Sequence, residues 1–405
     1  MPNYNYEDII GKVESLPWCA LVTTGRVGTD FFQSLLDSHP EVFVFNGILF
    51  FYNEFWDKSY CVKYPGDADV NDMAEEFTGN YIWKLKSKYD YEERKDELGE
   101  NMDQSINIDT AIFREHLTEL LKIRPVTSRS FLQAVYVSYS LSLGQDIRKK
   151  TIFFHHVHHI SKLKRYLNDF PDSKVISMTR DPRATYVSGV EHWIEYDSER
   201  DHLKRAFKVL KRTILDAHLL RTNSINLRIL KLEDTGNDEI LYLICDWLGI
   251  EYNNCLKKST WAGLRWWGDR ISLKKATNIE IGFSSTMIKN NWEKKLPKLD
   301  KALLNYLISD RLSWLSYEKK KSYSLIYHVL MFIIIPFPTV YERRYLSPLY
   351  IYSIIASKKK MRLKRILWSF YYYPRRIVFY YSLFFRKMIG KRYDLPLFKV
   401  SNNGK

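Results

Sequence analysis

The stretch PWCALVTTGRVGTDFFQSLLDS, residues 17–38, decides the fold. Its first part, residues 17–24, is a run of apolar and β-branched side chains, which is typical of a short strand buried on both faces. The glycines of Gly25-Arg26-Val27-Gly28 predict a turn, and the apolar residues of 29–38 recur at the spacing of one helix face. A helix that begins directly after a buried strand is the repeating unit of an α/β sheet.

The same alternation continues along the chain. We predict further strands at 42–45, 151–154, 174–179 and 226–232, and further helices at 130–143, 182–193 and 239–248. Strands that alternate with helices predict a parallel sheet covered on both faces, which is a three-layer, P-loop-like α/β domain. Residues 57–109 are polar and mixed in charge, so we expect an insertion or a substrate-facing subdomain there.

Composition sets the class of protein. The chain has 405 residues, of which 45% are hydrophobic and 27% charged, and these values fit a globular protein. Its four cysteines form no Cys-x-x-Cys pair, which argues against a disulfide framework and a thiolate zinc site. The N-terminus is neither a secretory signal nor a signal anchor by its composition. We therefore expect a cytoplasmic protein without a bound metal.

Positive charge is concentrated at the C-terminal end. Residues 319–405 contain 19 Lys and Arg and two acidic residues, which gives them a net charge of +17, whereas residues 1–318 are at −2. Any anionic partner is therefore expected mainly at the C-terminal end. We expect an α/β domain over 1–318 and a separate basic, aromatic, helical region over 319–405.

The C-terminal region has the composition of a membrane-associating segment. Basic clusters alternate with Trp, Tyr and Phe, which suit the headgroup level of an anionic membrane. The apolar run at 325–338 has 14 residues, fewer than the roughly 20 of a simple spanning helix. We expect a peripheral or re-entrant contact at the inner face of the membrane, and no nucleic-acid partner. A helical appendage packed on the α/β domain is the alternative.

Two strand-to-helix junctions have the chemistry of phosphate sites. At the first, the glycines let the backbone approach an anion at a helix N-terminus, where Thr29 adds a hydroxyl and Arg26 a charge. The loop lacks the Gly-Lys-Ser/Thr of a Walker A motif. At the second, Arg180 ends a strand and Ser188 follows two turns into the next helix. The alternative at each junction is an ordinary strand–helix turn.

Together the two junctions resemble the PAPS-dependent sulfotransferase family of the bacterial and carbohydrate type. The resemblance covers roughly residues 17–300 and implies that a sulfuryl group is transferred from PAPS to a hydroxyl of a carbohydrate, glycolipid or lipid-linked sugar. It implies that the donor 5′-phosphosulfate is held by Arg26, Val27, Gly28 and Thr29, and the 3′-phosphate by Arg180 and Ser188. The Gly-rich basic loop at 263–270 is similar to one that closes over the donor, which adds Arg265 and Arg270.

The catalytic base is less defined. Asp30 stands where the family usually has Ser or Thr, and Asn46-Gly47 stands where many carbohydrate-type members have a glutamate, so that Glu54 is the nearest acid downstream. Histidine suits proton transfer near neutral pH, and a cluster of histidines follows a predicted strand. The candidates for catalysis are Arg26, Glu54, His155, His156, His158 and His159. Most of these histidines are equally compatible with simple packing.

Two other functions remain open at this level. A nucleotide-dependent kinase with a divergent phosphate loop would need Mg²⁺ and a loop lysine, which this loop lacks. A non-catalytic membrane-binding protein would use the α/β domain only as a scaffold.

Overall fold

We describe a computed structural model of the chain. It describes residues 4–23, 25–60, 69–86, 98–196, 209–213, 226–268, 292–340, 342, 352, 355–356, 363–389 and 395–399.

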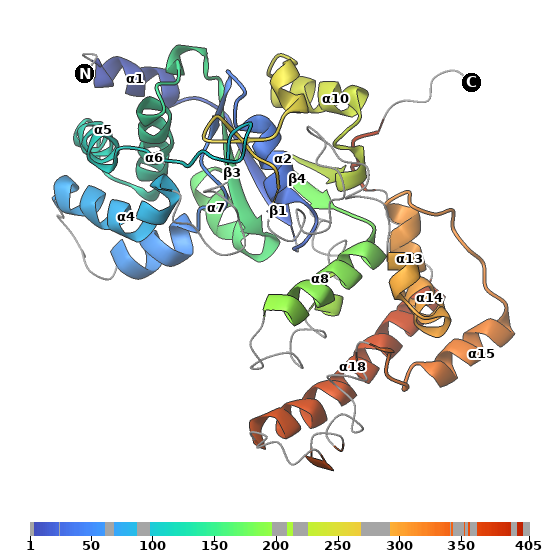
Figure 1. The fold of residues 1–405 in the computed structure, drawn as a ribbon. Coiled ribbons are helices and arrows are strands. Elements are labelled where there is room, and N and C mark those ends of the chain that lie inside the picture. Colours follow the sequence, from blue (N-terminus) through green and yellow to red (C-terminus); the bar gives the residue numbers. More distant parts are fainter. Residues whose placement is uncertain are drawn as a thin grey trace.

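A parallel sheet of five strands lies at the centre of the molecule, as the alternation of strands and helices predicts (Figure 1). The strands are β1 (Trp18–Thr23), β2 (Val42–Val44), β3 (Ile152–His159), β4 (Lys174–Thr179) and β5 (Leu227–Lys231). Their order in the sheet is β2-β3-β1-β4-β5. Strand β1 therefore lies in the middle and is buried along its whole length, because both faces of the sheet are covered.

Strand β3 is longer than the predicted strand at 151–154. It pairs with β1 up to His159, which lies opposite Thr23, so the histidines are part of the strand rather than of the loop after it. The register shifts between Leu21 and Val22, where His156 and then His158 are the partners and Val157 is skipped. His158 has a φ of 67°. This β-bulge redirects the side chains at the end of the strand.

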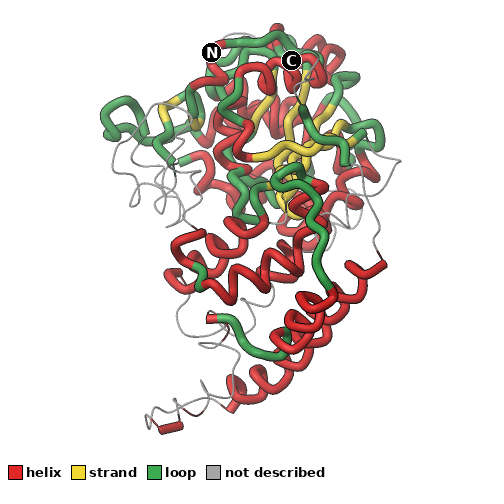
Figure 2. The backbone as a smooth tube through the Cα atoms, turned by 90° about the vertical axis from the view of Figure 1, so that its right-hand side faces the viewer, coloured by secondary structure: helices red, strands yellow, loops and turns green. Residues whose placement is uncertain are grey.

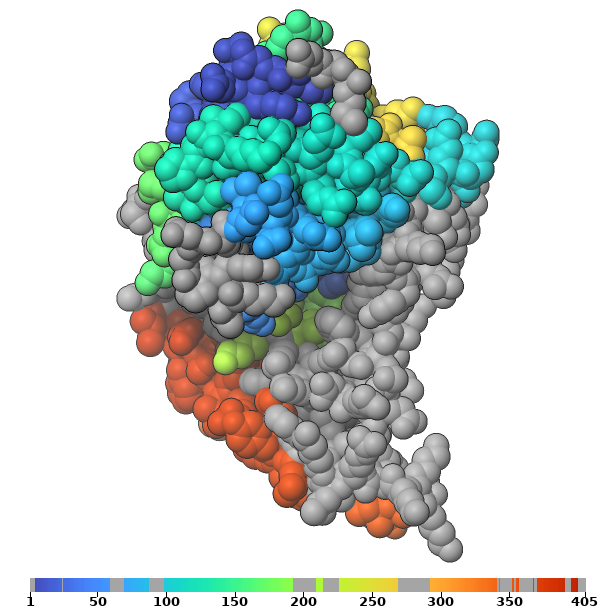
Figure 3. All heavy atoms as spheres, turned by 90° about the vertical axis from the view of Figure 1, so that its left-hand side faces the viewer, coloured from blue at the N-terminus to red at the C-terminus, as the bar shows by residue number. Residues whose placement is uncertain are grey.

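One face of the sheet is covered by helices from the first third of the chain and by α7. They are α1 (Tyr6–Val13), the π-helix η1 (Phe51–Tyr60), α4 (Val70–Leu85), α5 (Thr110–Lys122), α6 (Ser128–Ser142) and α7 (Leu163–Asp169). Met73 and Phe77 of α4 are buried in the same core as Trp18 and Phe153 of the sheet. The described part of 57–109 is thus integral to this layer, which forms a continuous surface in Figure 3.

The other face is covered by α2 (Thr29–Leu36) and α10 (Asp238–Leu248). Alternation along β1 assigns its residues to the two sides, so that Cys19 and Leu21 pack with α2 and α10 while Ala20 and Val22 pack on the opposite face. A small hairpin, β6 (Thr260–Trp261) and β7 (Leu264–Arg265), lies against the C-terminal end of α2. The short 3₁₀ turns are η2 (Ile147–Lys149), η3 (Ile160–Lys162), η4 (Leu232–Asp234) and η5 (Asn254–Lys257).

The remaining helices gather into a lobe below the sheet (Figures 1 and 2). This helical lobe consists of α8 (Pro182–Tyr196), α13 (Trp292–Lys295), α14 (Lys298–Trp314), α15 (Leu325–Ile334) and α18 (Leu363–Ile389). Its core joins Val187 of α8 and Leu307 of α14 to Met331 of α15 and Leu383 of α18. The predicted boundary between 318 and 319 therefore lies within one hydrophobic core.

The C-terminal segment returns to the sheet. The amide of Ile229 donates to the carbonyl of Pro396 at 2.8 Å, and the amide of Phe398 donates to Ile229 at 3.0 Å, so residues 395–398 lie along the β5 edge. Leu395 is buried in one core of the sheet and Phe398 in the other. Within the described ranges, no helix combines the length and the apolar character needed to cross a membrane.

Candidate active site at the carboxyl edge of the sheet

The loop after β1 has the backbone geometry of a candidate anion site. Gly25, Arg26 and Gly28 all have left-handed backbone conformations, with φ values of 115°, 56° and 82°. Gly28 is the N-cap of α2. Glycine has no side chain that could accept hydrogen bonds from the first N–H groups of the helix. A methyl group at Gly28 would lie 2.5 Å from Leu232 Cδ1, so the close approach of this loop to η4 needs glycine. Thr29 and Val27 are buried, and Val27 packs in the core.

The loop after β4 places a half-buried arginine, Arg180, beside the first loop. Burial lowers the pKa of Arg180, Arg26 lowers it further, and the charges of Glu233, Tyr317 and Asp181 oppose the change. Among the described residues, no group accepts a hydrogen bond from the buried Arg180 Nε. An arginine nitrogen that is buried without a partner carries a large desolvation cost, which an anionic ligand would offset.

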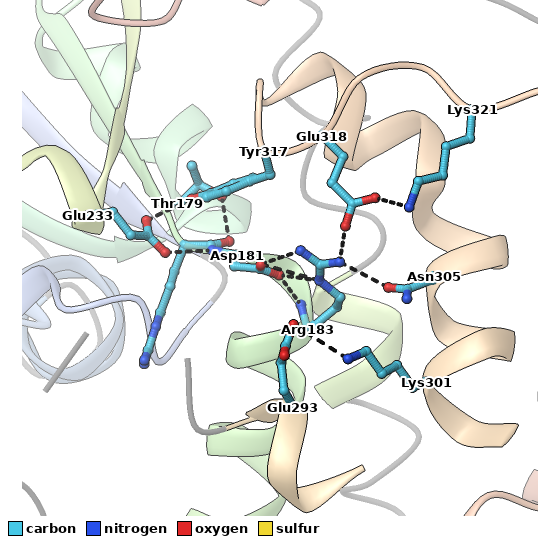
Figure 4. Close-up of polar contacts among 11 residues, drawn as sticks. Thr179, Asp181, Arg183, Glu233, Glu293, Lys301, Asn305, Tyr317, Glu318 and Lys321 are labelled. Carbon is cyan, nitrogen blue, oxygen red and sulfur yellow. Dashed lines mark hydrogen bonds and ion pairs between the residues drawn. The ribbon is translucent and has the colours of Figure 1, made fainter. Parts of the chain in front are cut away.

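Arg183, three residues later, is bonded in full to the protein (Figure 4). Its guanidinium donates to Asp181, with an Nη2–Oδ2 distance of 2.6 Å, and its Nη1 donates to Asn305 at 3.0 Å and to Glu318. These bonds join the start of α8 to α14 and to the segment after it. Arg183 therefore ties the loop after β4 and the start of α8 to the rest of the helical lobe, and Arg180 is the arginine of this junction with a nitrogen that has no acceptor among the described residues.

The order of the strands explains why the two loops meet. Strands β3, β1 and β4 are neighbours and parallel, so their carboxyl ends lie side by side. His158 lies at the last but one position of β3, Arg26 follows β1 and Arg180 follows β4. We call this region the carboxyl edge, and it is where ligands of open α/β sheets bind.

Several positive charges act on His158. Burial, followed by the charges of His159, Lys162, Arg212 and Arg26, lowers the pKa of His158 to about 3. Arg26 thus acts on both His158 and Arg180. Arg26, Arg180 and His158 therefore lie in one basic region at the carboxyl edge.

The four histidines have different surroundings. The ring of His155 is buried on the α6 side, where its Nδ1 lies 2.8 Å from the Tyr136 hydroxyl, and burial lowers its pKa to about 3. It points into the core and away from Arg26. His156 is buried on the α2 side. Only His158 and His159, both partly exposed, lie among the basic residues of the carboxyl edge.

Glu54 lies on the far side of a lysine from these histidines. Burial lowers the pKa of Lys162, and the charge of Glu54 raises it by a smaller amount. The charge of Lys162 in turn lowers the pKa values of His158 and His159. Lys162 Nζ also lies 4.1 Å from the centre of the Phe50 ring. Lys162 and Arg212 were not among the predicted site residues. Lys162 directly follows the histidine strand, which is a usable signal, whereas nothing in the sequence distinguishes Arg212.

The structure does not bring every predicted residue to this edge. Arg265 is buried in the β6–β7 hairpin, which Asp37 anchors at the C-terminal end of α2, opposite the phosphate loop. Its guanidinium lies 4.5 Å from the centre of the Trp267 ring. Arg270 lies outside the described residues. Ser188 is partly exposed on α8. In the described part of the chain, no group of three or more His, Cys, Asp or Glu side chains is arranged to hold a metal ion.

Comparisons with known proteins give only distant likenesses. No model of a protein family matches the chain, and no curated protein matches it. Its structure is similar to the sulfotransferase domain from the curacin biosynthetic pathway, with a TM-score of 0.40 and 14% identity over 75% of this chain and 99% of that one. It is also similar to the sulfotransferase domain of the Synechococcus PCC 7002 olefin synthase, with a TM-score of 0.36 and 16% identity over 72% and 94%. At these scores, function has to be inferred from the site itself.

Proposed function

We propose that this chain is a sulfotransferase that moves a sulfuryl group from PAPS to a hydroxyl of a carbohydrate, glycolipid or lipid-linked sugar. One observation carries the proposal: β3, β1 and β4 are parallel neighbours, so the loops that hold Arg26 and Arg180 and the base candidate His158 converge at one edge of the sheet. A donor with phosphate at two positions matches two separate anion-binding loops. The sequence resemblance of both loops to the family supports the same donor.

The residues present fit such a donor. The left-handed loop at 25–28 and the uncapped start of α2 suit a phosphosulfate, and the unpartnered Nε of Arg180 suits a second phosphate. When bound, PAPS supplies an activated sulfuryl group. Arg26 and the N–H groups of α2 would stabilise negative charge on the leaving phosphate, and they would act from fixed positions.

His158 is the best base among the predicted residues. It is neutral near pH 7, because its pKa lies near 3, and a neutral imidazole can accept a proton. A bound polyanion would partly offset the positive charges around it and raise its pKa toward the working pH. Glu54, which is exposed and lies beyond Lys162, is the alternative.

We further propose that the acceptor is met at an anionic membrane surface on the cytoplasmic side. The supporting observation is α15, whose outward face is apolar. Met331 packs into the lobe, while the opposite face exposes Leu325, Ile326, Val329, Leu330 and Ile333 to between 48% and 82%. The exposed Lys319 and Lys320 precede it and suit an anionic headgroup. Apolar contact and positive charge together are what interfacial helices use.

Calorimetric titration tests the donor site. Adenosine 3′,5′-bisphosphate, the desulfated product of PAPS, should bind without Mg²⁺, and 5′-AMP should bind at least tenfold more weakly because it lacks the 3′-phosphate. Arg26→Ala should weaken the binding of both nucleotides. Binding of Mg·ATP in preference to the bisphosphate would replace the proposal with a kinase. A folded chain that binds none of these nucleotides would rule out both enzymes.

A further inference from the structure

Hydrogen bonds fix the proton positions on two histidines of β3. The side-chain amide of Gln33 on α2 lies 2.5 Å from the carbonyl of Phe45 and 3.2 Å from that of Gly47 through its Nε2. Carbonyl oxygens only accept, so the NH₂ group must face them. The Oε1 of Gln33 is therefore the atom that lies 2.8 Å from His156 Nδ1. Because this oxygen only accepts, His156 must carry its proton on Nδ1.

The next contact follows from the first. Burial, followed by the charges of His158, His155 and Lys84, lowers the pKa of His156 well below its usual value, so the ring is neutral and its Nε2 has no proton. This Nε2 lies 3.3 Å from His158 Nδ1. Two bare nitrogens would repel, so His158 must donate from Nδ1. The neutral ring of His158 is then left with a bare Nε2, which is the atom that a general base uses.

Asp30 reinforces the same arrangement. Its Oδ1 lies 3.5 Å from His156 Nδ1, one helical turn before Gln33 on α2. The carboxylate that replaces the family's usual hydroxyl residue is thus directed toward His156. A carboxylate at this distance favours a proton on Nδ1.

We propose that Gln33, assisted by Asp30, acts through His156 to hold His158 in the tautomer with a proton on Nδ1 and a free Nε2. Gln33 and His156 are positioning residues, and the arrangement follows the general logic of a base that is oriented by a third group. Arg26, His159, Lys162 and Arg212 surround His158, and Asp30 and Lys84 face His156, whereas the hydrogen bond of His158 Nδ1 is the one to His156 Nε2. The proposal rests on the proposed function for its catalytic meaning, and on the hydrogen-bond geometry together with the neutral ring of buried His156 for the tautomer.

NMR of the full chain with ¹⁵N-labelled histidine tests the tautomer without any donor, with the His158 signals assigned from a His158→Asn variant. At pH 7.5 the wild-type His158 should be protonated on Nδ1. His156→Leu removes the acceptor and should shift His158 toward the Nε2-protonated form. His156→Gln places an amide oxygen near the former Nε2 and should keep the wild-type form. A wild-type His158 that is protonated on Nε2 overturns the proposal.

Kinetics give a second, separable readout. His156→Leu should lower the kcat of sulfuryl transfer by about 10- to 100-fold with little change in the KM for the donor, and His156→Gln should recover at least tenfold of that loss. Equal losses in both variants, despite the expected NMR result, would show that the tautomer does not matter for catalysis. If the wild type transfers no sulfuryl group, the proposed function fails while the NMR result still decides the tautomer.

Discussion

The carboxyl edge and the helical lobe each bury an arginine, and they use it differently. In the lobe, Arg376 is fully buried and donates to Glu342 at 2.9 Å, to the Phe337 carbonyl at 2.9 Å and to the Ile335 carbonyl. At the carboxyl edge, Arg180 keeps a buried Nε for which the described residues provide no acceptor. Arg265 also has buried nitrogens without an acceptor in the described part of the chain, so it is the position of Arg180 beside Arg26, together with its free Nε, that makes it the candidate for binding a ligand.

The largest effect is expected from breaking the ion pair of the lobe. Glu342→Gln leaves the guanidinium of Arg376 buried without its counter-charge, and we expect the free energy of unfolding to fall by about 3–5 kcal/mol. Urea denaturation followed by circular dichroism measures the change. The double variant Glu342→Gln with Arg376→Met, which removes both charges, should recover most of the loss. A loss below about 1 kcal/mol in the single variant would show that Arg376 is not held by Glu342.

The matched pair Arg180→Ala and Arg183→Ala should separate ligand binding from folding. Arg180→Ala should weaken adenosine 3′,5′-bisphosphate binding by about 10- to 150-fold, the range for one charged hydrogen bond, and should leave the melting temperature nearly unchanged. Arg183→Ala removes the bonds to Asp181, Asn305 and Glu318, so it should lower the melting temperature and preserve affinity in the protein that remains folded. Equal changes in affinity and in melting temperature in the two variants would show that Arg180 and Arg183 do not have separate roles.

Acid should destabilise the sheet core. Histidine in an unfolded chain has a pKa near 6.5, whereas the pKa values of His155 and His158 are about 3 in the fold. The folded chain therefore binds fewer protons between these values, and stability is complete above pH 6.5 and falls as the pH decreases toward 3. Each histidine should contribute up to about 1.4 kcal/mol per pH unit.

Urea denaturation at a series of pH values measures this slope. His155→Asn removes one of the buried rings and should flatten it. A slope that is the same in the variant and the wild type would show that His155 does not stay neutral in the fold.

The sequence predicted the parts of the site that depend on local chemistry. Both phosphate loops follow from residues that are adjacent in the chain, and the alternation of strands and helices predicted the parallel sheet. The order of the strands, which places Arg180 and His158 on either side of Arg26, depends on long-range packing and has no local signal. The role of Gln33 depends on two carbonyls more than ten residues away.

Other predictions differ from the structure for physical reasons. The histidines were expected after the strand at 151–154, yet they continue β3, where Tyr136 and Gln33 satisfy the buried rings of His155 and His156. The basic loop at 263–270 was expected to close over the donor. Asp37 instead accepts hydrogen bonds from Thr260 and Gly263 and holds the β6–β7 hairpin at the other end of α2.

The smallest effect on folding is expected at the exposed face of α15. The carboxyl edge leaves an arginine nitrogen without an acceptor among the described residues, whereas the helical lobe leaves this apolar face exposed to solvent. Ile326 and Ile333 are 82% and 57% exposed. Replacing both by Glu should change the free energy of unfolding by no more than about 0.5 kcal/mol per site. It should nevertheless weaken binding to vesicles of phosphatidylcholine with phosphatidylserine by at least tenfold, since apolar contact is lost and like charge is added.

The control uses apolar residues that are exposed on the α/β domain. Ile82→Glu with Tyr242→Glu alters side chains that are 42% and 54% exposed and should leave vesicle binding within twofold of the wild type. Cosedimentation with vesicles and analytical ultracentrifugation distinguish the possible outcomes. The wild type could instead remain in the supernatant with anionic vesicles and form dimers that the α15 substitutions abolish. That result would mean that a second copy of the chain covers this face. The exposed apolar face of α15 would then be a dimer interface, and the sulfuryl acceptor would be a molecule in solution rather than at a membrane.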